Sequence, residues 1–467
     1  MTDWQGKNVT VAGLGVSGVP AAKVLRGLGA KVTVVNDGDD ARAREQAAEL
    51  EALGVTVRLG DGATLPDGTE LIVTAPGWKP DKPLFAAADA AGVPVWGDVE
   101  LAWRLRKPGA APWLAVTGTN GKTTTVQMLA SILKAAGLRT AAVGNIGVSL
   151  LDAVLGEEEY DVLAVELSSY QLHWAPSLRA HSAAVLNLAP DHLDWHGSME
   201  AYAKDKGRVY EGNRVACVYN VADKATEDLV READVEEGCR AVGFTLGTPG
   251  PSQLGVVEGL LVDRAFVENR HKNAQELAEV SDVRPPAPHN IANALAAAAL
   301  ARAYGVPAGA VRDGLRAFTP DAHRIAHVAD LDGVAYVDDS KATNTHAAGA
   351  SLAAYESIVW IAGGLAKGAT FDELVADSAK RLRGAVLIGR DRALIREALA
   401  RHAPEVPVVD LDRTDTGAML QAVQEAKRLA RPGDTVLLAP ACASMDMFAN
   451  YNKRGDAFAQ AVRELGA

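Results

Sequence analysis

Short runs rich in β-branched residues alternate with Ala- and Leu-rich amphipathic stretches along the whole sequence of 467 residues. This alternation is typical of βαβ units, in which helices cover the faces of a parallel sheet. Near the N-terminus it predicts strands at 8–12, 31–35 and 71–74 and helices at 19–28 and 41–53. The chain is therefore expected to have an α/β fold built from parallel sheets.

Two breaks in the alternation divide the sequence. Pro and Gly in Lys107–Pro112 end one helical pattern, and a new unit starts near Phe318–Pro320. Since domains of about 100–200 residues are usual, three are expected. The predicted domains are residues 1–109, 110–318 and 319–467. Further strands are expected at 114–116, 162–166, 183–187 and 215–219 in the second domain, and at 334–337, 358–362, 385–388 and 435–438 in the third.

Charge and cysteine content narrow the class of protein. The 47 basic and 59 acidic residues give a net charge of −12, which opposes binding to nucleic acid or to anionic membranes. Cys217, Cys239 and Cys442 lack the spacing of a zinc site, and their odd number argues against a disulfide framework. No secretion signal precedes the first strand, and no apolar run approaches the ~20 residues that span a bilayer. We expect a cytoplasmic protein without an obligate protein partner.

A glycine-rich loop with the sequence GTNGKTT follows an apolar strand and begins a helix. Backbone N–H groups and the helix dipole at such a position can surround a polyphosphate. Lys122 adds a positive charge, and Thr123 offers a hydroxyl to Mg²⁺. The strict P-loop pattern fails because its first glycine would fall at Val116, but a simple glycine turn does not explain the lysine. The predicted ATP-binding residues of this loop are Gly118, Thr119, Asn120, Gly121, Lys122, Thr123 and Thr124.

A second glycine motif, GLGVSG at Gly13–Gly18, also follows a strand, and Asp37 comes at the end of the next one. Taken alone, this spacing predicts NAD binding. The same turn would hold the diphosphate of a nucleotide sugar, with Asp37 accepting hydrogen bonds from the ribose or the base. A plain tight turn is a third interpretation. We favour a nucleotide diphosphate.

Three residues near the phosphate loop suggest a metal site. Glu166, in the segment AVELSS, ends a predicted strand, and His192 lies in the loop PDHLD after another. Strand ends are where α/β sheets bind ligands, and Mg²⁺ prefers oxygen ligands. A loop histidine bonded to the backbone is the alternative for His192. Lys206 has two interpretations. It is a solvated charge on a helix face, or burial lowers its pKa and its amine reacts with CO₂ to give an anionic metal ligand. Sequence chemistry does not separate it from Lys204.

Later motifs suggest contacts with a nucleotide and a small anion. Asn290 and Asn293 share a helix face and could contact a base, although Asn290 also suits a helix N-cap. Opposite charges in His323–Arg324 and in Asp339–Asn344 suit either a nucleotide or a surface ion pair. The segments GGLAKG and PACAS each follow an apolar strand, so both are expected at one sheet edge.

Taken together, these segments resemble the Mur ligase family along essentially the whole chain. GTNGKTT, ELSS, DHLD, HNxxNA, HR and DSKATN occur here in the order of that family of ATP-dependent, amide-forming enzymes of bacterial peptidoglycan precursor synthesis. The segments GLGVSG, GGLAKG and ACASMDMF, the last followed by RGD, look like those of the members that add D-glutamate. The DNPR segment typical of diaminopimelate-adding members is not found.

The resemblance implies a Rossmann-like N-terminal domain that binds a UDP substrate, a P-loop-type central ATPase domain and a Rossmann-like C-terminal domain that binds an amino acid. It implies addition of D-glutamate to UDP-N-acetylmuramoyl-L-alanine through an acyl phosphate, with release of ADP and phosphate. The implied cofactors are ATP, two Mg²⁺ ions and a CO₂-derived carbamate on Lys206.

Roles for individual residues also follow from the resemblance. The catalytic residues would be Lys122, Lys206 and His192, and the metal ligands Thr123, Glu166, His192 and Lys206. The UDP substrate would contact Gly15, Val16, Ser17, Asp37, Asn145 and His192. ATP would also contact Asn290, Asn293, Arg324, Asp339 and Lys341, and D-glutamate would contact Thr343, Lys367, Ser444 and Tyr451.

Three other interpretations each account for part of the sequence. Folylpolyglutamate synthase-like ligases share the phosphate loop but lack an N-terminal GxGxxG domain. An NAD-dependent dehydrogenase would leave GTNGKTT and DHLD unexplained. A non-catalytic nucleotide-binding regulator is the third, and measured turnover would exclude it.

Overall fold

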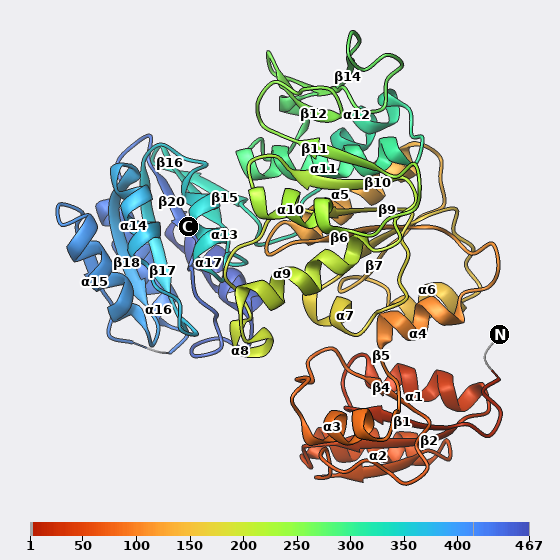
Figure 1. Ribbon diagram of the computed structural model, residues 1–467. Helices are drawn as coiled ribbons and strands as arrows, with labels where there is room; N and C mark the ends of the chain where they lie inside the picture. The colour runs from red at the N-terminus through yellow and green to blue at the C-terminus, as the bar shows by residue number, and fades with distance from the viewer. Residues whose placement is uncertain (1–2, 414, 467) are drawn as a thin grey trace. The chain divides into compact units, whose positions relative to one another are not determined.

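The computed structural model describes residues 3–413 and 415–466, which form three β-sheets with helices packed against them (Figure 1). The α/β fold class is therefore confirmed. The chain divides into two compact units: one runs to Val283 and includes Ile291–Phe318, and the other comprises Arg284–Asn290 and the chain from Thr319 onward. The first unit contains two of the sheets, so the boundary proposed after residue 109 lies inside it and stays a prediction.

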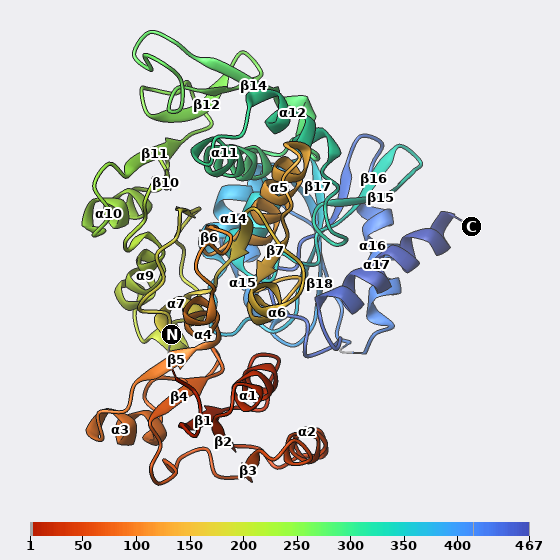
Figure 2. The same cartoon turned by 90° about the vertical axis from the view of Figure 1, so that its right-hand side faces the viewer.

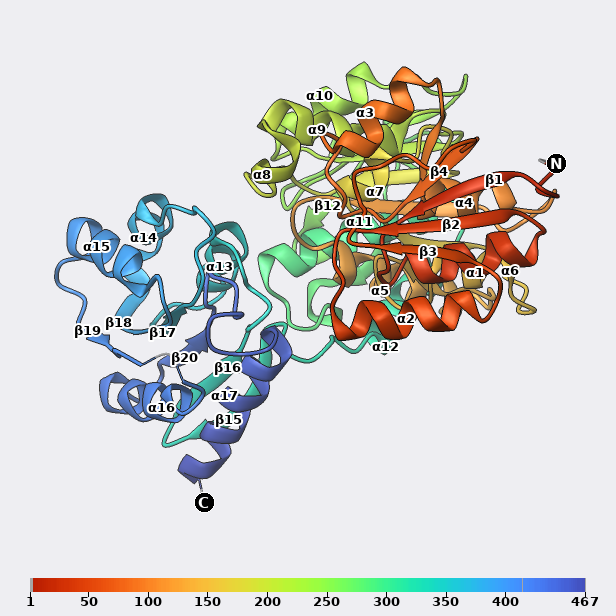
Figure 3. The same ribbon diagram turned by 90° about the horizontal axis from the view of Figure 1, so that it is seen from below.

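The N-terminal sheet is wholly parallel, in the strand order β3-β2-β1-β4-β5 (Figure 3). Its strands are β1 (Asn8–Ala12), β2 (Lys31–Asn36), β3 (Thr56–Leu59), β4 (Leu71–Thr74) and β5 (Val95–Gly97), and its helices are α1 (Gly18–Gly27), α2 (Ala41–Glu51) and α3 (Pro83–Ala90). Alternate apolar residues of β1 and β2 pack with α1 and α2 on one face and with α3 on the other. Because β1 lies between β2 and β4, the loop after β1 lies where the strand order reverses, the usual ligand position in such sheets.

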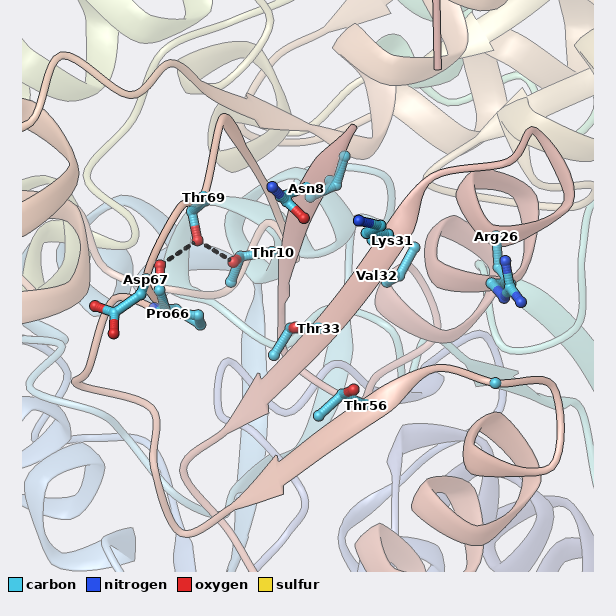
Figure 4. Close-up of a pocket in the computed structure, with 12 residues that line it drawn as sticks. Asn8, Thr10, Arg26, Lys31, Val32, Thr33, Thr56, Pro66, Asp67 and Thr69 are labelled. Carbon is cyan, nitrogen blue, oxygen red and sulfur yellow. Dashed lines mark hydrogen bonds between the residues drawn. The ribbon is translucent and has the colours of Figure 1, made fainter. Parts of the chain in front are cut away.

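A polar cavity of about 300 Å³ lies at the opposite end of this sheet (Figure 4). Asn8, Lys31 and Thr56, the first residues of three strands, line it together with Thr10, whose hydroxyl is hydrogen-bonded to Thr69. The cavity is therefore separate from the glycine loop, which follows the carboxyl end of β1.

The central sheet has nine strands, in the order β14-β13-β12-β11-β10-β9-β6-β8-β7 (Figure 2). They are β6 (Trp113–Thr117), β7 (Ala142–Gly144), β8 (Leu163–Glu166), β9 (Ser182–Val185), β10 (Ala216–Asn220), β11 (Arg240–Phe244), β12 (Gln253–Val257), β13 (Leu260–Asp263) and β14 (Gln275–Glu279). Pairing is parallel from β7 to β12 and antiparallel from β12 to β14. The expectation of a wholly parallel sheet is wrong at this edge because a tight turn joins β12 to β13 and a longer loop joins β13 to β14, both without a crossover helix.

Helices cover both faces of this sheet around strand β6, all five residues of which are buried. The helices of this region are α4 (Asp98–Leu105), α5 (Lys122–Ala135), α6 (Leu150–Leu155), α7 (Ser169–His173), α8 (Leu193–His196), α9 (Met199–Gly207), α10 (Lys224–Glu232), α11 (Pro288–Ala303) and α12 (Ala308–Ala317). Apolar residues of α5, α11 and α12 form one core with one face of the sheet, and those of α4, α6 and α7 pack on the other. The phosphate loop thus joins a buried strand to a buried helix.

The third sheet has the strand order β15-β16-β20-β17-β18-β19. Its strands are β15 (Ala326–Leu331), β16 (Val334–Asp338), β17 (Ile358–Gly363), β18 (Leu382–Ile388), β19 (Val408–Asp410) and β20 (Thr435–Leu438). Its helices are α13 (Thr345–Leu352), α14 (Asp372–Ser378), α15 (Arg392–His402), α16 (Ala418–Leu429) and α17 (Tyr451–Gly466). Helices α13, α14 and α15 cover one face, and α16 and α17 cover the other. Only the edge strand β15 is antiparallel to its neighbour.

Some predicted local features differ from the structure. Helix α11 begins at Pro288, so Asn290 lies in its first turn and is not the N-cap; proline suits the first helical position because its missing N–H would be unpaired there anyway. Strand β2 ends at Asn36, so Asp37 follows the strand. In residues 3–413 and 415–466, no helix is both long enough and apolar enough to cross a membrane.

A glycine contact fixes how closely α12 packs on α5, and it generates a stability prediction. A Cβ on Gly314 would lie 2.4 Å from the backbone Cα of Ile132, whereas one on Gly309 in the same helix would meet nothing within 4 Å. Gly314→Ala should therefore lower the free energy of unfolding by about 1–3 kcal/mol. Gly309→Ala, the matched control, should raise it by about 0.5–1 kcal/mol. Thermal unfolding of both variants tests this; equal midpoints would contradict it.

Candidate functional site

Two glycines shape the phosphate loop between β6 and α5. Gly121 has φ 83° and precedes the first residue of the helix, and a Cβ there would lie 2.4 Å from Oδ1 of Asn293. A Cβ on Gly118, where φ is 152°, would lie 3.0 Å from Cβ of Leu186. The loop therefore approaches α11 and the end of β9 more closely than a residue with a side chain would allow.

Polar contacts then fix the rest of this loop. The Asn120 N–H donates to Oδ1 of Asn187 at 2.9 Å, and the hydroxyls of Thr119 and Tyr202 lie 3.0 Å apart. Nζ of Lys122 donates to the carbonyl oxygens of Gly118 and Thr119, each at 2.9 Å. The lysine, the hydroxyls of Thr123 and Thr124 and the N-terminus of α5 thus lie together, which is the arrangement that binds a polyphosphate.

The buried lysine beside this loop is Lys206, on α9. Its residue is only 2% exposed, and Nζ donates to the Gly118 carbonyl at 2.8 Å and lies 3.4 Å from Oγ1 of Thr117. Burial, reinforced by the positive charge of Lys122, places the pKa of Lys206 well below its usual value. Lys204 is exposed on the same helix. Burial thus separates the two lysines that sequence chemistry left equivalent.

An anchor for α9 was not identified from the sequence. The Asp205 carboxylate accepts hydrogen bonds from Nδ1 of His173 at 2.9 Å and of His196 at 3.0 Å. Burial opposes ionisation of Asp205, but these histidines outweigh it and lower its pKa to about 2. Asp205 points to α7 and α8 while the next side chain, Lys206, points to the phosphate loop. No sequence motif marks this contact, because it depends on the packing of three short helices.

Glu166 ends β8 and is buried, at 2% exposure. Its Oε1 accepts a hydrogen bond from Nδ2 of Asn145 at 2.9 Å, but its buried Oε2 has no hydrogen-bond partner. Buried carboxylate oxygens are costly to leave unpaired, so this orphan oxygen fits a cation ligand. Asn145, expected to contact the UDP substrate, thus lies beside the predicted metal ligand.

His192 precedes the first residue of α8 with φ 56°, and its side chain is 44% exposed. Partial burial, together with the charges of Lys122 and Lys206, lowers its pKa against the opposing effect of Asp191. The neutral imidazole, which is the form that binds metals, is therefore favoured. Its ring centre lies 4.9 Å from that of Tyr170, which also stacks on His196.

The described residues contain no group of three or more His, Cys, Asp or Glu side chains that could hold a metal. Among the predicted ligands, only Glu166 and His192 belong to these residue types. A carbamate on Lys206 would supply a further anionic ligand, and Thr123 a hydroxyl.

The predicted UDP-substrate residues surround the loop after β1. A Cβ on Gly18 would lie 1.9 Å from the Gly13 carbonyl oxygen, so the turn requires glycine there. Gly15 has open space around its Cα, Val16 is 90% exposed, and Ser17 Oγ donates to Asp98 at 2.9 Å. Asp37 forms an ion pair with Lys82. An exposed loop with a nearby carboxylate and ammonium suits a charged nucleotide.

Several other predicted residues of the second unit lie on loops that follow β16, β17 and β20, whereas Arg324 precedes β15 and Tyr451 begins α17. Thr343 lies between β16 and α13, and Lys341 Nζ lies 4.0 Å from the ring centre of Tyr451. The loops that carry Lys367 and Ser444 are joined by two hydrogen bonds between the backbones of Leu365 and Ala443, of 2.9 and 3.0 Å. The residues predicted to bind D-glutamate therefore come from connected loops.

The buried arginine Arg454 joins these loops. In the sequence it stands out only as part of the RGD segment. Arg454 is 1% exposed and donates to the carbonyls of Ser340 at 2.9 Å and of Cys442 at 3.0 Å. Asn290, also in this unit, donates to the Pro285 carbonyl at 3.3 Å.

Asp339, predicted to bind ATP, is a buried carboxylate held by its own unit. It accepts hydrogen bonds from the Ile325 N–H at 3.2 Å and from the hydroxyl of Ser351. Burial raises its pKa from 3.8 to about 6, against the opposing effects of these hydrogen bonds and of Arg324. Arg324 also lies 3.8 Å from the carboxylate of Asp321.

This raised pKa predicts the pH dependence of an Asp339→Asn variant. Between 3.8 and about 6 the folded state binds more protons than the unfolded state, so the wild-type chain loses stability as the pH rises through about 6. Asparagine retains the acceptor for Ile325 and carries no buried charge. The stability gained by Asp339→Asn should therefore be larger at pH 8 than at pH 5 by about 1.4 kcal/mol, because about one pKa unit of the shift lies above pH 5. Thermal unfolding at both pH values measures this; a gain that is larger at pH 5 would contradict it.

Three regions of the chain match known protein families, and the predicted site residues lie within them except for Ser444 and Tyr451. Residues 116–301 match the Mur ligase middle domain, and residues 323–442 match the Mur ligase, glutamate ligase domain. Residues 8–70 match the family described as pyridine nucleotide-disulphide oxidoreductase. That last match covers only β1 to β3 and their helices, where the dinucleotide-type glycine turn lies.

Individual relatives match over the full length. A protein of Streptomyces coelicolor named UDP-N-acetylmuramoylalanine--D-glutamate ligase is 90% identical, with 100% of both chains covered. The protein of the same name from Streptomyces avermitilis is 89% identical, also with 100% of both covered. Among solved structures, MurF from Acinetobacter baumannii matches with a TM-score of 0.59 and 18% identity, covering 93% of this chain and 90% of MurF, which supports the fold alone. From the two matched domains and the full-length relatives, we conclude that this chain belongs to the Mur ligase family.

Proposed function

We propose that this chain is an ATP-dependent ligase that joins D-glutamate to UDP-N-acetylmuramoyl-L-alanine in cytoplasmic peptidoglycan precursor synthesis. The observation that carries the proposal is the 89–90% identity, over complete chains, to relatives named for this reaction. The phosphate loop with Lys122 and the buried pair of Lys206 and Glu166 supply chemistry that suits it.

The first unit supplies the groups that would act on phosphate. The N-terminus of α5 and Lys122 would bind the ATP phosphates and offset their negative charge as the alanine carboxylate approaches. Glu166, through its unpaired Oε2, would hold Mg²⁺ with His192 and the hydroxyl of Thr123. Bound Mg²⁺ would neutralise further charge on the transferred phosphoryl group.

The reaction would then proceed in two steps. An oxygen of the alanine carboxylate bonds to the γ-phosphorus, the bond to the β-phosphate oxygen breaks, and ADP leaves. The neutral amine of D-glutamate attacks the carbonyl carbon of the acyl phosphate, phosphate leaves, and the amine proton passes to solvent. The loops that carry Lys367 and Ser444 would bind the D-glutamate carboxylates, since they offer a cation and a hydroxyl.

We infer that Lys206 reacts with CO₂. Its neutral amine would form a bond to the carbon of CO₂ and lose a proton, which gives a carbamate anion. Burial supports this step because it favours the uncharged amine, which is the nucleophile. The positive charge of Lys122 nearby would stabilise the product anion.

The substrate assignment is tested by phosphate release from the purified protein with ATP and UDP-N-acetylmuramoyl-L-alanine. We expect release with D-glutamate and, in parallel reactions, at most background release with L-glutamate or meso-diaminopimelate. No release with D-glutamate, or faster release with meso-diaminopimelate, would refute the assignment.

The lysine assignment predicts different effects for two neighbouring variants. Lys206→Ala removes the buried amine and should lower kcat by about 100-fold or more, the size of effect seen when one charge-stabilising group is lost. Lys204→Ala removes an exposed side chain of the same helix and should leave kcat within about twofold. The same phosphate-release assay measures both. Full activity in Lys206→Ala with loss in Lys204→Ala would show that the roles are reversed.

A further inference from the structure

The backbone around Arg324 is held in an unusual conformation. His323 has φ 63° and Ile325 has φ 48°. The left-handed region is uncommon for residues other than glycine and is strongly disfavoured for a β-branched residue such as isoleucine. Surrounding contacts must therefore hold this segment in place.

Two hydrogen bonds fix the backbone on either side of Arg324. The Lys341 N–H donates to the His323 carbonyl at 3.2 Å, and the Ile325 N–H donates to Oδ1 of Asp339 at 3.2 Å. Both partners lie just after β16. The direction in which Arg324 leaves the backbone is therefore set by the residues before and after it.

The imidazole of His323 supplies a third attachment. Its Nδ1 lies 2.6 Å from Oδ2 of Asp338 on β16, and its Nε2 lies 3.4 Å from Oδ1 of Asp456 on α17. The side chain of His323 is 11% exposed. The ring thus connects the strand to the helix.

Gly455, on the first turns of α17, provides the space for this ring. A Cβ there would lie 2.1 Å from Nδ1 of His323 and 2.8 Å from Oδ2 of Asp338. Glycine weakens a helix relative to alanine, so its position here suits the close approach of the ring.

Packing alone does not hold the imidazole. A cavity of about 540 Å³ adjoins it, lined by His323, Asp338 and Asp456 as well as Gln460 and Arg463. Because one side of the ring borders this cavity, the two carboxylates and the space at Gly455 determine its orientation.

We propose that His323, placed between Asp338 and Asp456 in the space left by Gly455, is a positioning residue that fixes Arg324 for binding of ATP phosphates. The inference rests on the proposed function, in which Arg324 contacts the nucleotide. His323 acts through the backbone of Arg324 and itself touches no substrate.

The test compares three single variants in the intact chain. Gly455→Ala places a methyl group where Nδ1 lies, and His323→Ala removes the ring; each should raise the Kd for ADP and the KM for ATP by about tenfold or more. His323→Asn keeps a donor for Asp338, and asparagine tolerates the left-handed region, so it should stay within about threefold of wild type. The KM for D-glutamate should change less than about twofold in all three.

Two further variants separate positioning from folding. Gly349→Ala, in α13, is the matched glycine control, because its Cβ would meet only Leu374 Cδ1 at 3.4 Å; it should leave both constants unchanged. The double variant His323→Ala/Gly455→Ala relieves the clash and should regain the thermal midpoint of His323→Ala while keeping the raised Kd for ADP.

Unchanged ADP affinity in Gly455→Ala and His323→Ala would overturn the proposal, as would equal increases in the KM values for ATP and D-glutamate. Failure of His323→Asn to retain ADP affinity would also overturn it. Calorimetric binding of ADP needs neither acceptor substrate. A wild-type chain that binds ADP but does not use D-glutamate would therefore refute the substrate assignment and leave this test intact.

Discussion

The proposed phosphate site depends on the contact by which the Lys206 amine is buried against the Gly118 carbonyl. The 2.8 Å hydrogen bond joins α9 to the loop that follows β6, a fully buried strand. Asp205, the residue before Lys206, is hydrogen-bonded to two histidines on α7 and α8, so α9 is also held next to the lysine. Moving this helix would alter the loop, the buried amine and the nearby Tyr202 hydroxyl together.

The groups proposed to act on phosphate lower the stability of the folded chain around them. Lys206 has a buried amine, and Glu166 has a buried carboxylate oxygen without a hydrogen-bond partner. Burying each of these groups costs free energy, which the apolar core around β6 must offset. Such polar groups are retained where a ligand completes their contacts. In the second unit, buried Asp339 and the left-handed backbone at Ile325 suggest the same pattern.

The sequence predicts much of this architecture because its strands are short, apolar and bounded by glycine or proline. The predicted ranges 8–12, 71–74 and 435–438 coincide with β1, β4 and β20. The antiparallel strands β13 and β14 were missed because their residues alternate weakly and come without helices. The family resemblance favoured Lys206 over Lys204, and burial supplies the physical reason that sequence chemistry lacked. The role of Asp205 required the positions of α7 and α8, which local patterns do not determine.

We propose that the lowered pKa of the Lys206 amine allows it to react with CO₂. Carbon-13 NMR of the intact protein supplied with ¹³C-labelled bicarbonate tests it most directly. We expect a carbamate resonance in the wild-type chain and in Lys204→Ala, and none in Lys206→Ala. A wild-type spectrum without this resonance, or a resonance that persists in Lys206→Ala, would contradict it.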